Sequence, residues 1–469
     1  MRPAEWKALD SVLSGEVILP GAPGYDLASR ALNARFDDVR ATAVVRCANP
    51  ADVSEAVGFA RRHGLAVATR GGAHCFGGRS STDGLLVDVT QIRFVRLSDG
   101  VATVGGGTRL GEVYDTLLPR NEVIPAGSCP SVGIAGLTLG GGFGLIGRKH
   151  GLTSDNLLAA QIVLADGRAI ECDEHHEPDL FWALRGAGPG NFGVVTELSF
   201  RTVPPPGATN FQLSWPFSQV EPLIEAWQAW APAAPEELAA SLLVKSAAEP
   251  GEPPSVGVAG IYLGGEPDAL ELIERLVSRA PADPAAFEVR HLPFSETTRY
   301  WGARAAREPV AGQPAGQELR GCRFIKSEFF RQALPPEAIR ALLANFGMHR
   351  VAGETRELDF SPWGGAYNHL TPDATAFAHR DERFILKHAG EVAPGAGAAE
   401  REAAHAWTRR SWNTVHPWAS GHVFPNFPDP DLADWPRAYY GGNLARLLGV
   451  KARYDPDGLF RFRQALPVT

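Results

Sequence analysis

A strand, a helix and a second strand follow one another within residues 42–72, and the second strand runs directly into a glycine-rich loop. The segment "TAVVRC" is rich in β-branched residues, and the next segment has Asn49 at a capping position, Pro50 in its first turn and Gly64 at its end. Between Asn49 and Gly64, apolar residues recur at Val53, Ala56, Val57 and Ala60, the spacing of a helix with one buried face. The strand "LAVATR" then leads into "GGAHCFGG", and loops of this kind bring backbone N–H groups close to phosphates.

More strand patterns follow, and they divide the chain into lobes. The strand "LLAAQIVLADG" ends in an Asp-Gly hairpin turn, and "RAIEC" is predicted as the returning strand. The strand "VVTELSFRTVP" closes a first lobe, and "PPPGATN" at 204–210 is the expected boundary. In residues 211–410, amphipathic helices such as "EPDALELIERLVSRA" and "PPEAIRALLANFG" alternate with strand-like runs. This alternation predicts an α+β lobe in which helices back a sheet. A chain of 469 residues also exceeds what one hydrophobic core usually holds, so two lobes are expected.

Charge and cysteine content exclude several classes of partner. The formal net charge of −8 argues against nucleic acid or a basic membrane-binding face. No apolar stretch approaches the 18 or more residues of a membrane span, and the first residues lack the apolar core of a secretory signal, so a cytoplasmic location is expected. The odd number of cysteines and the absence of CxxC spacing indicate neither a disulfide framework nor a metal site. The five are Cys47, Cys75, Cys129, Cys172 and Cys322.

Two GxGxxG motifs raise the alternative of a nicotinamide dinucleotide site. They are "GFGLIG" at 142–147 and "GPGNFG" at 188–193. A dinucleotide fingerprint needs a strand before the glycines and a helix after them. "GFGLIG" follows a loop and leads into "RKHGLTSDN", which is a poor helix, and Asp166 at the expected distance lies in a hairpin turn. The glycines therefore favour tight packing around a flat or phosphorylated group over a Rossmann site.

Several blocks together carry a family resemblance. "ATRGGAHCFGG" is similar to the first flavin loop of FAD-linked oxidases of the vanillyl-alcohol-oxidase type. "AGSCPSVGIAGLTLGGGFGLIGRKHGLTSDNLLAAQIVLADG" resembles the second signature of the berberine-bridge-enzyme-like branch. "RGAGPGNFGVVTELSFR", "PWGGAYNHLTPDATAFAHR" and "YYGGNLARLLGVKARYDPDGLF" resemble its later blocks in the same order. The resemblance implies a two-lobed α+β fold with a PCMH-type FAD-binding domain at 1–203. An inserted substrate domain with a helix-backed antiparallel sheet is implied at 204–410, and a returning segment at 411–469.

The resemblance also implies how the flavin is held. In this family a histidine of the first loop is bonded to the flavin 8α-methyl carbon and a cysteine of the second loop to ring carbon C6, which carries these roles to His74 and Cys129. Imidazole and thiolate are side chains nucleophilic enough for this chemistry. The other implied cofactor contacts are at Arg70, Gly71, Gly72, Ala73, Cys75, Gly78, Val132, Gly133, Gly136, Gly140, Gly141, Gly142, Val195, Tyr440 and Asn443.

The roles of these contacts differ. Arg70 to Gly78 and Gly140 to Gly144 are implied to wrap the pyrophosphate and adenosine, and Val195 to offer backbone contacts. Tyr440 and Asn443 are implied to lie along the pyrimidine edge of the flavin. Ala73 stands where the family has a glycine, and we expect it to fit only with a negative φ.

The catalytic base is where this chain departs from the family. The usual base is a tyrosine that ends a Tyr-x-Asn-Tyr motif, but here the stretch reads "FPNF", with Phe424 and Phe427 at the tyrosine positions. A neutral alcohol needs a base near its proton, and phenylalanine cannot serve. The remaining candidates are Asp359, Tyr367 and His369, of which Tyr367 and His369 are expected to share one face of a strand.

The predicted function is an FAD-dependent oxidase that passes a hydride to flavin N5 and the electrons to O2. Oxygen is expected because the gate position of the family holds the small Val132. The missing tyrosines favour a substrate that ionises unaided, an amine, or an apolar intermediate of secondary metabolism over a plain sugar. A non-redox cyclase or isomerase and a drug-binding resistance protein on the same scaffold are the alternatives.

Overall fold

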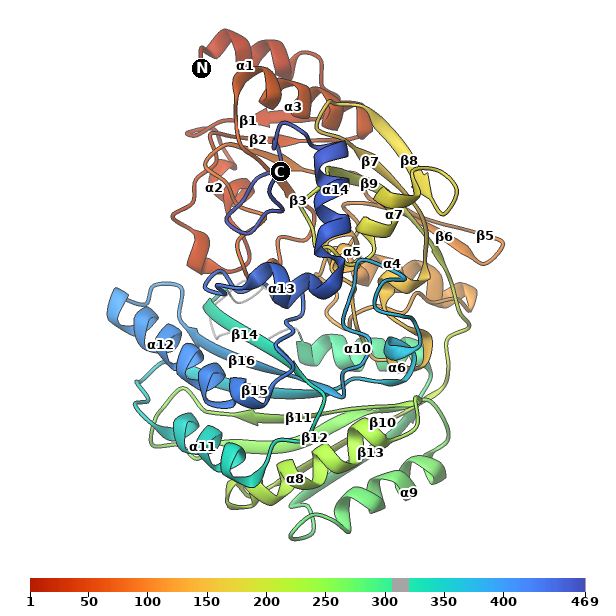
Figure 1. Cartoon of the computed structure of the whole chain (residues 1–469), viewed down its shortest axis with the longest axis vertical. Helices are drawn as coiled ribbons and strands as arrows, with labels where there is room; N and C mark the ends of the chain where they lie inside the picture. The colour runs from red at the N-terminus through yellow and green to blue at the C-terminus, as the bar shows by residue number, and fades with distance from the viewer. Residues whose placement is uncertain (306–319, 469) are drawn as a thin grey trace.

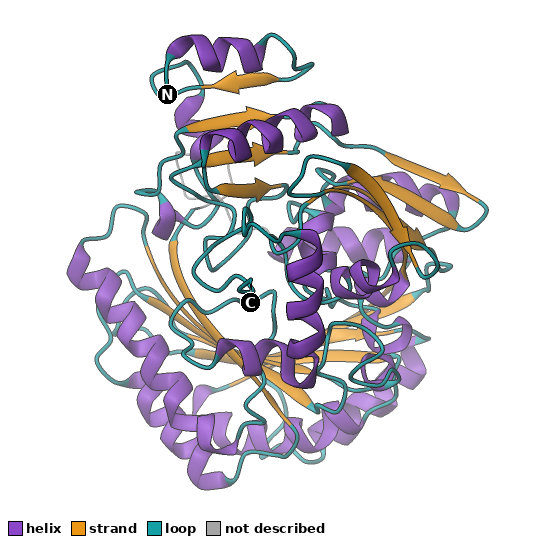
Figure 2. Cartoon of the chain, turned by 45° about the horizontal axis from the view of Figure 1, so that its top comes forward, coloured by secondary structure: helices purple, strands orange, loops and turns teal. Residues whose placement is uncertain are grey.

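Three β-sheets organise the computed structural model, which describes residues 1–305 and 320–468 (Figure 1). Two smaller sheets come from the first 201 residues, and a seven-stranded sheet comes from residues 208–392. Figure 2 shows that loops gather between the large sheet and the two smaller ones. Helices and antiparallel sheets are therefore combined as the sequence predicted, and the α+β class is confirmed.

The first sheet contains the predicted strand–helix–strand unit. Its four strands lie in the order β1-β2-β4-β3, with β4 parallel to both β2 and β3. The Asn49 side chain accepts a hydrogen bond from Asp52 N at 3.0 Å, and Gly64 ends the helix with φ = 65°, as its capping pattern predicts. The elements are α1 (Pro3–Asp10), β1 (Glu16–Ile18), α2 (Tyr25–Ser29), the 3-10 helix η1 (Ala34–Phe36), β2 (Ala43–Arg46), α3 (Pro50–His63), β3 (Val67–Arg70) and β4 (Leu85–Asp88).

The second sheet is antiparallel, with five strands in the order β5-β6-β9-β7-β8. The predicted hairpin joins β7 to β8, and Gly167 takes the positive φ of 87° that its turn needs. The elements are β5 (Val95–Ser98), β6 (Val101–Gly105), α4 (Leu110–Leu117), η2 (Leu118–Arg120), α5 (Ile134–Leu139), α6 (Gly147–His150), η3 (Thr153–Asn156), β7 (Leu157–Val163), β8 (Ala169–Asp173), α7 (Pro178–Leu184) and β9 (Val194–Arg201).

The large sheet is antiparallel, and α8, α9, α11 and α12 cover one of its faces, whereas α10 contacts Asn210 and Gln212 on the opposite face (Figure 1). Its strand order is β13-β10-β12-β11-β15-β16-β14, and apolar side chains of its strands pack against Trp227, Ile339 and Trp407 of the covering helices. The elements are β10 (Ala208–Trp215), η4 (Phe217–Gln219), α8 (Val220–Trp230), η5 (Ala231–Ala233), β11 (Leu238–Lys245), β12 (Ser255–Tyr262), α9 (Glu266–Val277), β13 (Ala286–Leu292), α10 (Phe294–Ala305), β14 (Cys322–Phe330), α11 (Pro336–Gly347), β15 (Thr355–Pro362), η6 (Gly365–Asn368), β16 (Phe384–Val392), α12 (Ala398–Val415) and η7 (His416–Trp418).

The C-terminal segment returns to the first part of the chain. It forms α13 (Trp435–Tyr440), η8 (Gly441–Asn443) and α14 (Leu444–Tyr454), and α14 packs on α7. The buried Lys451 donates to Asn191 O at 2.7 Å, which fixes α14 on the loop before β9. The division expected at residue 410 falls inside α12, a continuous helix that packs on β14 and β16. None of the helices in residues 1–305 and 320–468 is long and apolar enough to cross a membrane.

Candidate active site

The loops that carry His74 and Cys129 meet at one serine. The Ser131 hydroxyl oxygen lies 2.9 Å from His74 Nε2 and 3.4 Å from Cys129 Sγ. The backbones of the two loops also touch, since a Cβ atom on Gly72 would lie 2.2 Å from the Gly133 nitrogen. Glycine is therefore required at this contact, and the structure brings the two residues predicted to hold the flavin to one place.

Ala73 corrects one expectation about the first loop. We expected a negative φ for this residue, but its φ is +58°, in the left-handed region. An L-residue pays about 1–2 kcal/mol for this conformation. The loop holds it there because the Ala73 carbonyl accepts a hydrogen bond from Leu32 N at 3.2 Å. Alanine thus occupies a position at which the glycine of the family is the unstrained residue.

The glycines at 140–144 form a second tight turn. Gly141 and Gly142 have φ values of 106° and 76°, which L side chains rarely adopt. A Cβ atom on Gly140 would lie 2.1 Å from the Asn426 side-chain oxygen, and Asn426 donates to Leu137 O at 2.7 Å. The C-terminal segment therefore packs directly on this turn.

Buried polar atoms without hydrogen-bond partners lie just after the first loop, where the Arg79 guanidinium stacks on the Phe462 ring at 4.7 Å. Among the described residues, the terminal guanidinium nitrogens of Arg79 and the hydroxyls of Ser80 and Ser81 are buried without a hydrogen-bond partner. Native proteins rarely leave such donors unsatisfied unless a ligand or water completes them. Cationic and hydroxyl donors beside a glycine loop suit phosphate oxygens. The residues present therefore fit a dinucleotide such as FAD.

The side chain of Arg70 holds the loop in shape. It is buried, and its guanidinium donates to the carbonyls of Ser29 and Ser80, at 3.0 and 2.9 Å, and of Ala28. Any contact of Arg70 with a cofactor must then come from its backbone.

Four other predicted cofactor contacts lie in four different elements, α5, β9, α13 and η8. Tyr440 donates to Ala187 O at 3.0 Å, and the Asn443 amide donates to Pro372 O at 2.7 Å, so the donors of both side chains bind backbone carbonyls. The Val195 carbonyl oxygen lies 2.3 Å from the position that a Cβ atom on Gly106 would take, so Val195 packs closely on Gly106. Gly136 is exposed, and beyond its own helix a Cβ atom built on it would meet open space among the described residues.

Phenylalanine rings line the site. The ring centroids of Phe76 and Phe427 are 5.9 Å apart, and those of Phe143 and Phe427 are 6.1 Å apart. Phe427 is half-buried, whereas Phe424 is 2% exposed and packs among Phe329, Trp363 and Phe377. Of the two residues at the tyrosine positions, Phe427 therefore borders the site and Phe424 belongs to the core.

On the face of the large sheet opposite α8, α11 and α12, strands β14, β15 and β16 carry charged side chains. Strand pairing places Ser327, Lys387 and Asp359 in one row across β14, β16 and β15. Lys387 Nζ lies 2.7 Å from the Asp359 carboxylate and 5.7 Å from the centroid of the Phe427 ring. The Asp359–Lys387 pair therefore stands next to the phenylalanine that borders the flavin loops.

Neighbouring charges keep this face ionised. Burial lowers the pKa of Lys387, but Asp359 and Glu357 outweigh it and raise the pKa above the ordinary value. Burial raises the pKa of Glu357, but Lys387, Lys245 and Arg323 together lower it to about 2. Burial also lowers the pKa of Arg323, and the charge of Glu357 opposes this effect.

Two of the three candidate bases are placed elsewhere. The strand expected through Tyr367 and His369 is wrong, because β15 ends at Pro362 and Gly364 and Gly365 take φ values of 83° and 58°. Tyr367 is buried in η6, and its hydroxyl accepts from Gly144 N at 3.2 Å and donates to Gly144 O at 3.1 Å.

Burial also raises the pKa of Tyr367, so this hydroxyl supports the glycine turn and is a poor base. His369 is exposed, and its Nε2 lies 2.7 Å from a Glu236 carboxylate oxygen. Of the three candidates, only Asp359 pairs with Lys387, whose amine lies near the Phe427 ring.

Sequence reasoning missed Lys387, Glu357, Arg323 and Ser131. The polar–apolar alternation of "TRELDFSP" and "FILKHAGEV" would have placed Glu357 and Lys387 on the face opposite α8, α11 and α12. No sequence signal pairs Ser131 with His74, because 57 residues separate them.

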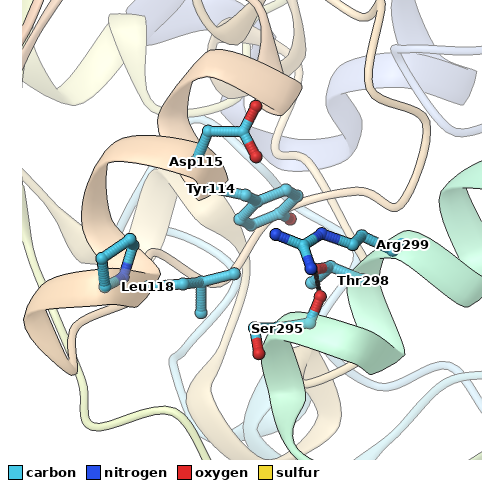
Figure 3. Close-up of a pocket in the computed structure, with 7 residues that line it drawn as sticks. Tyr114, Asp115, Leu118, Ser295, Thr298 and Arg299 are labelled. Carbon is cyan, nitrogen blue, oxygen red and sulfur yellow. Dashed lines mark hydrogen bonds between the residues drawn. The ribbon is translucent and has the colours of Figure 1, made fainter.

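A pocket of about 230 Å³ lies at the junction of the two lobes, apart from this site (Figure 3). Tyr114 and Asp115 of α4 line one side, and Thr298 and Arg299 of α10 line the other. The Tyr114 hydroxyl donates to Gly127 O at 2.7 Å, so the pocket touches the rear of the Cys129 loop. None of the residues that form the flavin loops lines it.

Comparisons with known proteins agree with the site. Residues 41–173 match the family model described as "FAD binding domain", and residues 423–467 match "Berberine and berberine like". The chain is 32% identical to the uncharacterized FAD-linked oxidoreductase YvdP of Bacillus subtilis, over 97% of this chain and 98% of that protein.

Solved structures agree as well. BBE-like 1 of Physcomitrella patens matches with a TM-score of 0.88 and 27% identity over 99% of each chain. Glucooligosaccharide oxidase of Acremonium strictum, described as carrying a 6-S-cysteinyl, 8α-N1-histidyl FAD, matches with a TM-score of 0.86 and 24% identity over 99% of each chain. The glycine loops, the unsatisfied phosphate-type donors and these matches converge on one conclusion: the chain belongs to the berberine-bridge-enzyme-like family of FAD-linked oxidoreductases.

Proposed function

We propose that this protein is an oxidase that binds FAD through covalent bonds to both His74 and Cys129 and oxidises a small, largely apolar molecule with O2 as the acceptor. The observation that carries the proposal is the meeting of His74 and Cys129 at Ser131. The 6-S-cysteinyl, 8α-N1-histidyl linkage described for glucooligosaccharide oxidase supports the same two bonds here.

The residues of the site divide the work between binding and proton transfer. Bound FAD supplies a hydride acceptor and passes the electrons to the final acceptor. Arg79, Ser80 and Ser81 supply donors for the phosphates, and the paired glycines Gly72 and Gly133 let the two loops close on the ring. Asp359 takes the proton of the substrate hydroxyl or amine, and Lys387 holds the carboxylate by an ion pair at 2.7 Å.

The rings at the site point to the substrate class. Phe76, Phe143 and Phe427 offer apolar ring surface and no hydrogen-bonding group, whereas a sugar needs many polar partners. Asp359, Lys387 and Ser361 supply polar groups on one side only. A molecule with an apolar ring system and one hydroxyl or amine at its reacting end fits this division, and an oligosaccharide does not.

We predict that Phe427→Tyr changes turnover of the native substrate by less than about 10-fold, because Asp359 already supplies a base. The variant should gain little on a glucooligosaccharide, as measured by oxygen uptake. Phe424→Tyr is the matched control: its hydroxyl would enter the buried ring cluster and lower the free energy of unfolding by about 1–3 kcal/mol. A gain above about 100-fold on the sugar with Phe427→Tyr would show that the apolar substrate class is wrong.

Substitution of Val132 tests whether O2 is the electron acceptor. This half-buried residue lies three positions after Cys129, and its backbone is fixed by a hydrogen bond from Leu110 N to its carbonyl at 2.9 Å. We predict that Val132→Leu slows reoxidation of the reduced protein by air at least about 10-fold, which corresponds to about 1.4 kcal/mol of barrier. Stopped-flow mixing with oxygenated buffer measures this rate. Reduction by substrate without oxygen should stay unchanged, and equal reoxidation rates in both proteins would remove Val132 as the oxygen gate.

Anaerobic mixing with candidate substrates tests the proposed function as a whole. An oxidase loses its yellow absorbance when substrate is added and recovers it in air with formation of hydrogen peroxide. Apolar alcohols and amines should bleach the protein, and oligosaccharides should not. A protein that binds or isomerises these molecules while its absorbance stays unchanged would be a binder or a non-redox cyclase, and the proposal would fail.

A further inference from the structure

Ser131 provides one hydroxyl between the two residues proposed to hold the flavin. We propose that Ser131 is the positioning residue for covalent attachment: its oxygen accepts a hydrogen bond from His74 Nε2–H, and its own proton is donated to Cys129 Sγ. The two distances, 2.9 Å and 3.4 Å, suit an N–H···O bond and an O–H···S bond. This inference rests on the proposed attachment of FAD at His74 and Cys129.

The loop around Ser131 is fixed by its backbone. Gly111 N donates to Pro130 O at 2.9 Å, Leu110 N to Val132 O at 2.9 Å, and Ile134 N to Thr108 O at 3.0 Å. These bonds flank Ser131 on both sides and tie its loop to the start of α4. The hydroxyl therefore stays at a defined place between His74 and Cys129, as a positioning group must.

The hydrogen bond to Nε2 selects the nitrogen that reacts. In neutral imidazole one nitrogen carries the proton and the other carries the lone pair. With Nε2–H donated to Ser131, the lone pair is on Nδ1, which is the nitrogen of an N1-histidyl bond. The His74 bond then forms between Nδ1 and the 8α-carbon, while one C–H bond of the methyl group and the Nε2–H bond break. Ser131 is the acceptor next to the departing Nε2 proton.

The hydrogen bond to sulfur prepares the second bond. A hydroxyl donor stabilises the thiolate, which is the nucleophilic form of cysteine. The Cys129 bond forms between Sγ and C6, while the S–H and C6–H bonds break. Each attachment thus removes two protons and two electrons, and O2 is the oxidant that takes them, with one H2O2 formed per bond. Oxygen is the acceptor already proposed for the enzyme.

A serine that only joined two loops would affect stability and leave attachment chemistry unchanged. Two backgrounds separate these roles, because Cys129→Ala leaves only the His74 bond and His74→Ala leaves only the Cys129 bond. Protein produced under riboflavin limitation is mixed with FAD in air, and acid-stable flavin is followed over time by intact mass and absorbance. This readout requires no substrate and no turnover.

We expect Ser131→Ala to slow formation of each bond at least about 10-fold, below the 10²–10⁴-fold typical of direct proton transfer because the residue acts by positioning. Ser131→Thr and Ser131→Val have nearly the same shape and differ in the hydroxyl, so Thr should restore the rate and Val should not. Ser128→Ala is the matched control, since no described hydrogen bond joins the Ser128 hydroxyl to His74 or Cys129.

Each outcome decides the proposal. Rates within about 2-fold of the parent for Ser131→Val in both backgrounds would overturn it. If Ser131→Ala does not fold, the Thr and Val pair still compares the hydroxyl at constant shape. A parent protein that forms no covalent bond at all would instead refute the proposed bicovalent flavin, which is a different failure.

Discussion

Acid precipitation of the His74→Ala/Cys129→Ala double variant should release all of its flavin, whereas the unmodified protein and each single variant should keep the flavin on the polypeptide. Two independent bonds are proposed, so either one alone retains the ring. Denaturation removes every noncovalent contact, including those of Arg79 and the glycine loops, and leaves only covalent attachment. The measurement is flavin absorbance in the acid supernatant against that in the pellet, with intact mass as a second readout.

The Cys75→Ala variant is the control for this experiment. Cys75 follows His74 directly, is half-buried as Cys129 is, and is not proposed as an attachment residue. Its variant should retain flavin as the unmodified protein does. Complete release of flavin from the unmodified protein by acid would contradict both covalent bonds, and release from one single variant would show that only the mutated residue is linked.

Asp359→Asn should lower kcat/KM for the native substrate by about 10²–10⁴-fold, because it removes the proposed base beside Lys387 and keeps the shape of the side chain. The asparagine can still accept from Lys387 and Ser361, so the loss reports proton transfer. We expect the loss in kcat, with KM nearly unchanged, because the interaction is made in the transition state. The rate of flavin reduction by substrate in the absence of O2 measures this loss separately from the reoxidation of the flavin.

Glu357→Gln is the matched control for Asp359. Glu357 also binds Lys387, at 3.1 Å, but strand pairing places it one row further along the sheet. The Glu357→Gln substitution should lower kcat/KM by less than about 10-fold, because it removes a neighbouring charge and no base. Equal losses in the two variants would assign the effect to the charge around Lys387, and an active Asp359→Asn would remove Asp359 as the base. Covalent flavin should be unaffected in both.

Local patterns in the sequence determined much of the fold. The strand–helix–strand unit before His74 and the hairpin of β7 and β8 were predicted correctly, because capping by Asn49, the left-handed Gly64 and the turn glycine Gly167 act over a few residues. The family blocks likewise placed His74 and Cys129 on glycine-rich loops. Interactions between neighbours in the chain fix these features, so they can be read from the order of residues.

Two other expectations were wrong because of local backbone geometry. Ala73 is held at a positive φ by the loop around it, although alanine by itself prefers the opposite sign. Gly364 and Gly365 adopt positive φ values that end β15 and turn Tyr367 away from the sheet, which strand alternation could not anticipate. In both places the surrounding structure overrode the intrinsic preference of the residue.

Only the tertiary structure decided which polar groups form the site. Asp359 and Lys387 form an ion pair although 28 residues separate them, and Ser131 lies within hydrogen-bonding distance of His74 although 57 residues separate them. The same packing separates Phe427, which borders the flavin loops, from Phe424, which is buried three residues earlier. The sequence by itself determined local elements such as α3 and the β7–β8 hairpin, and it supplied His74 and Cys129 as the proposed attachment residues. Their neighbours depend on contacts between distant segments, because burial and ion pairing act through space and not along the chain.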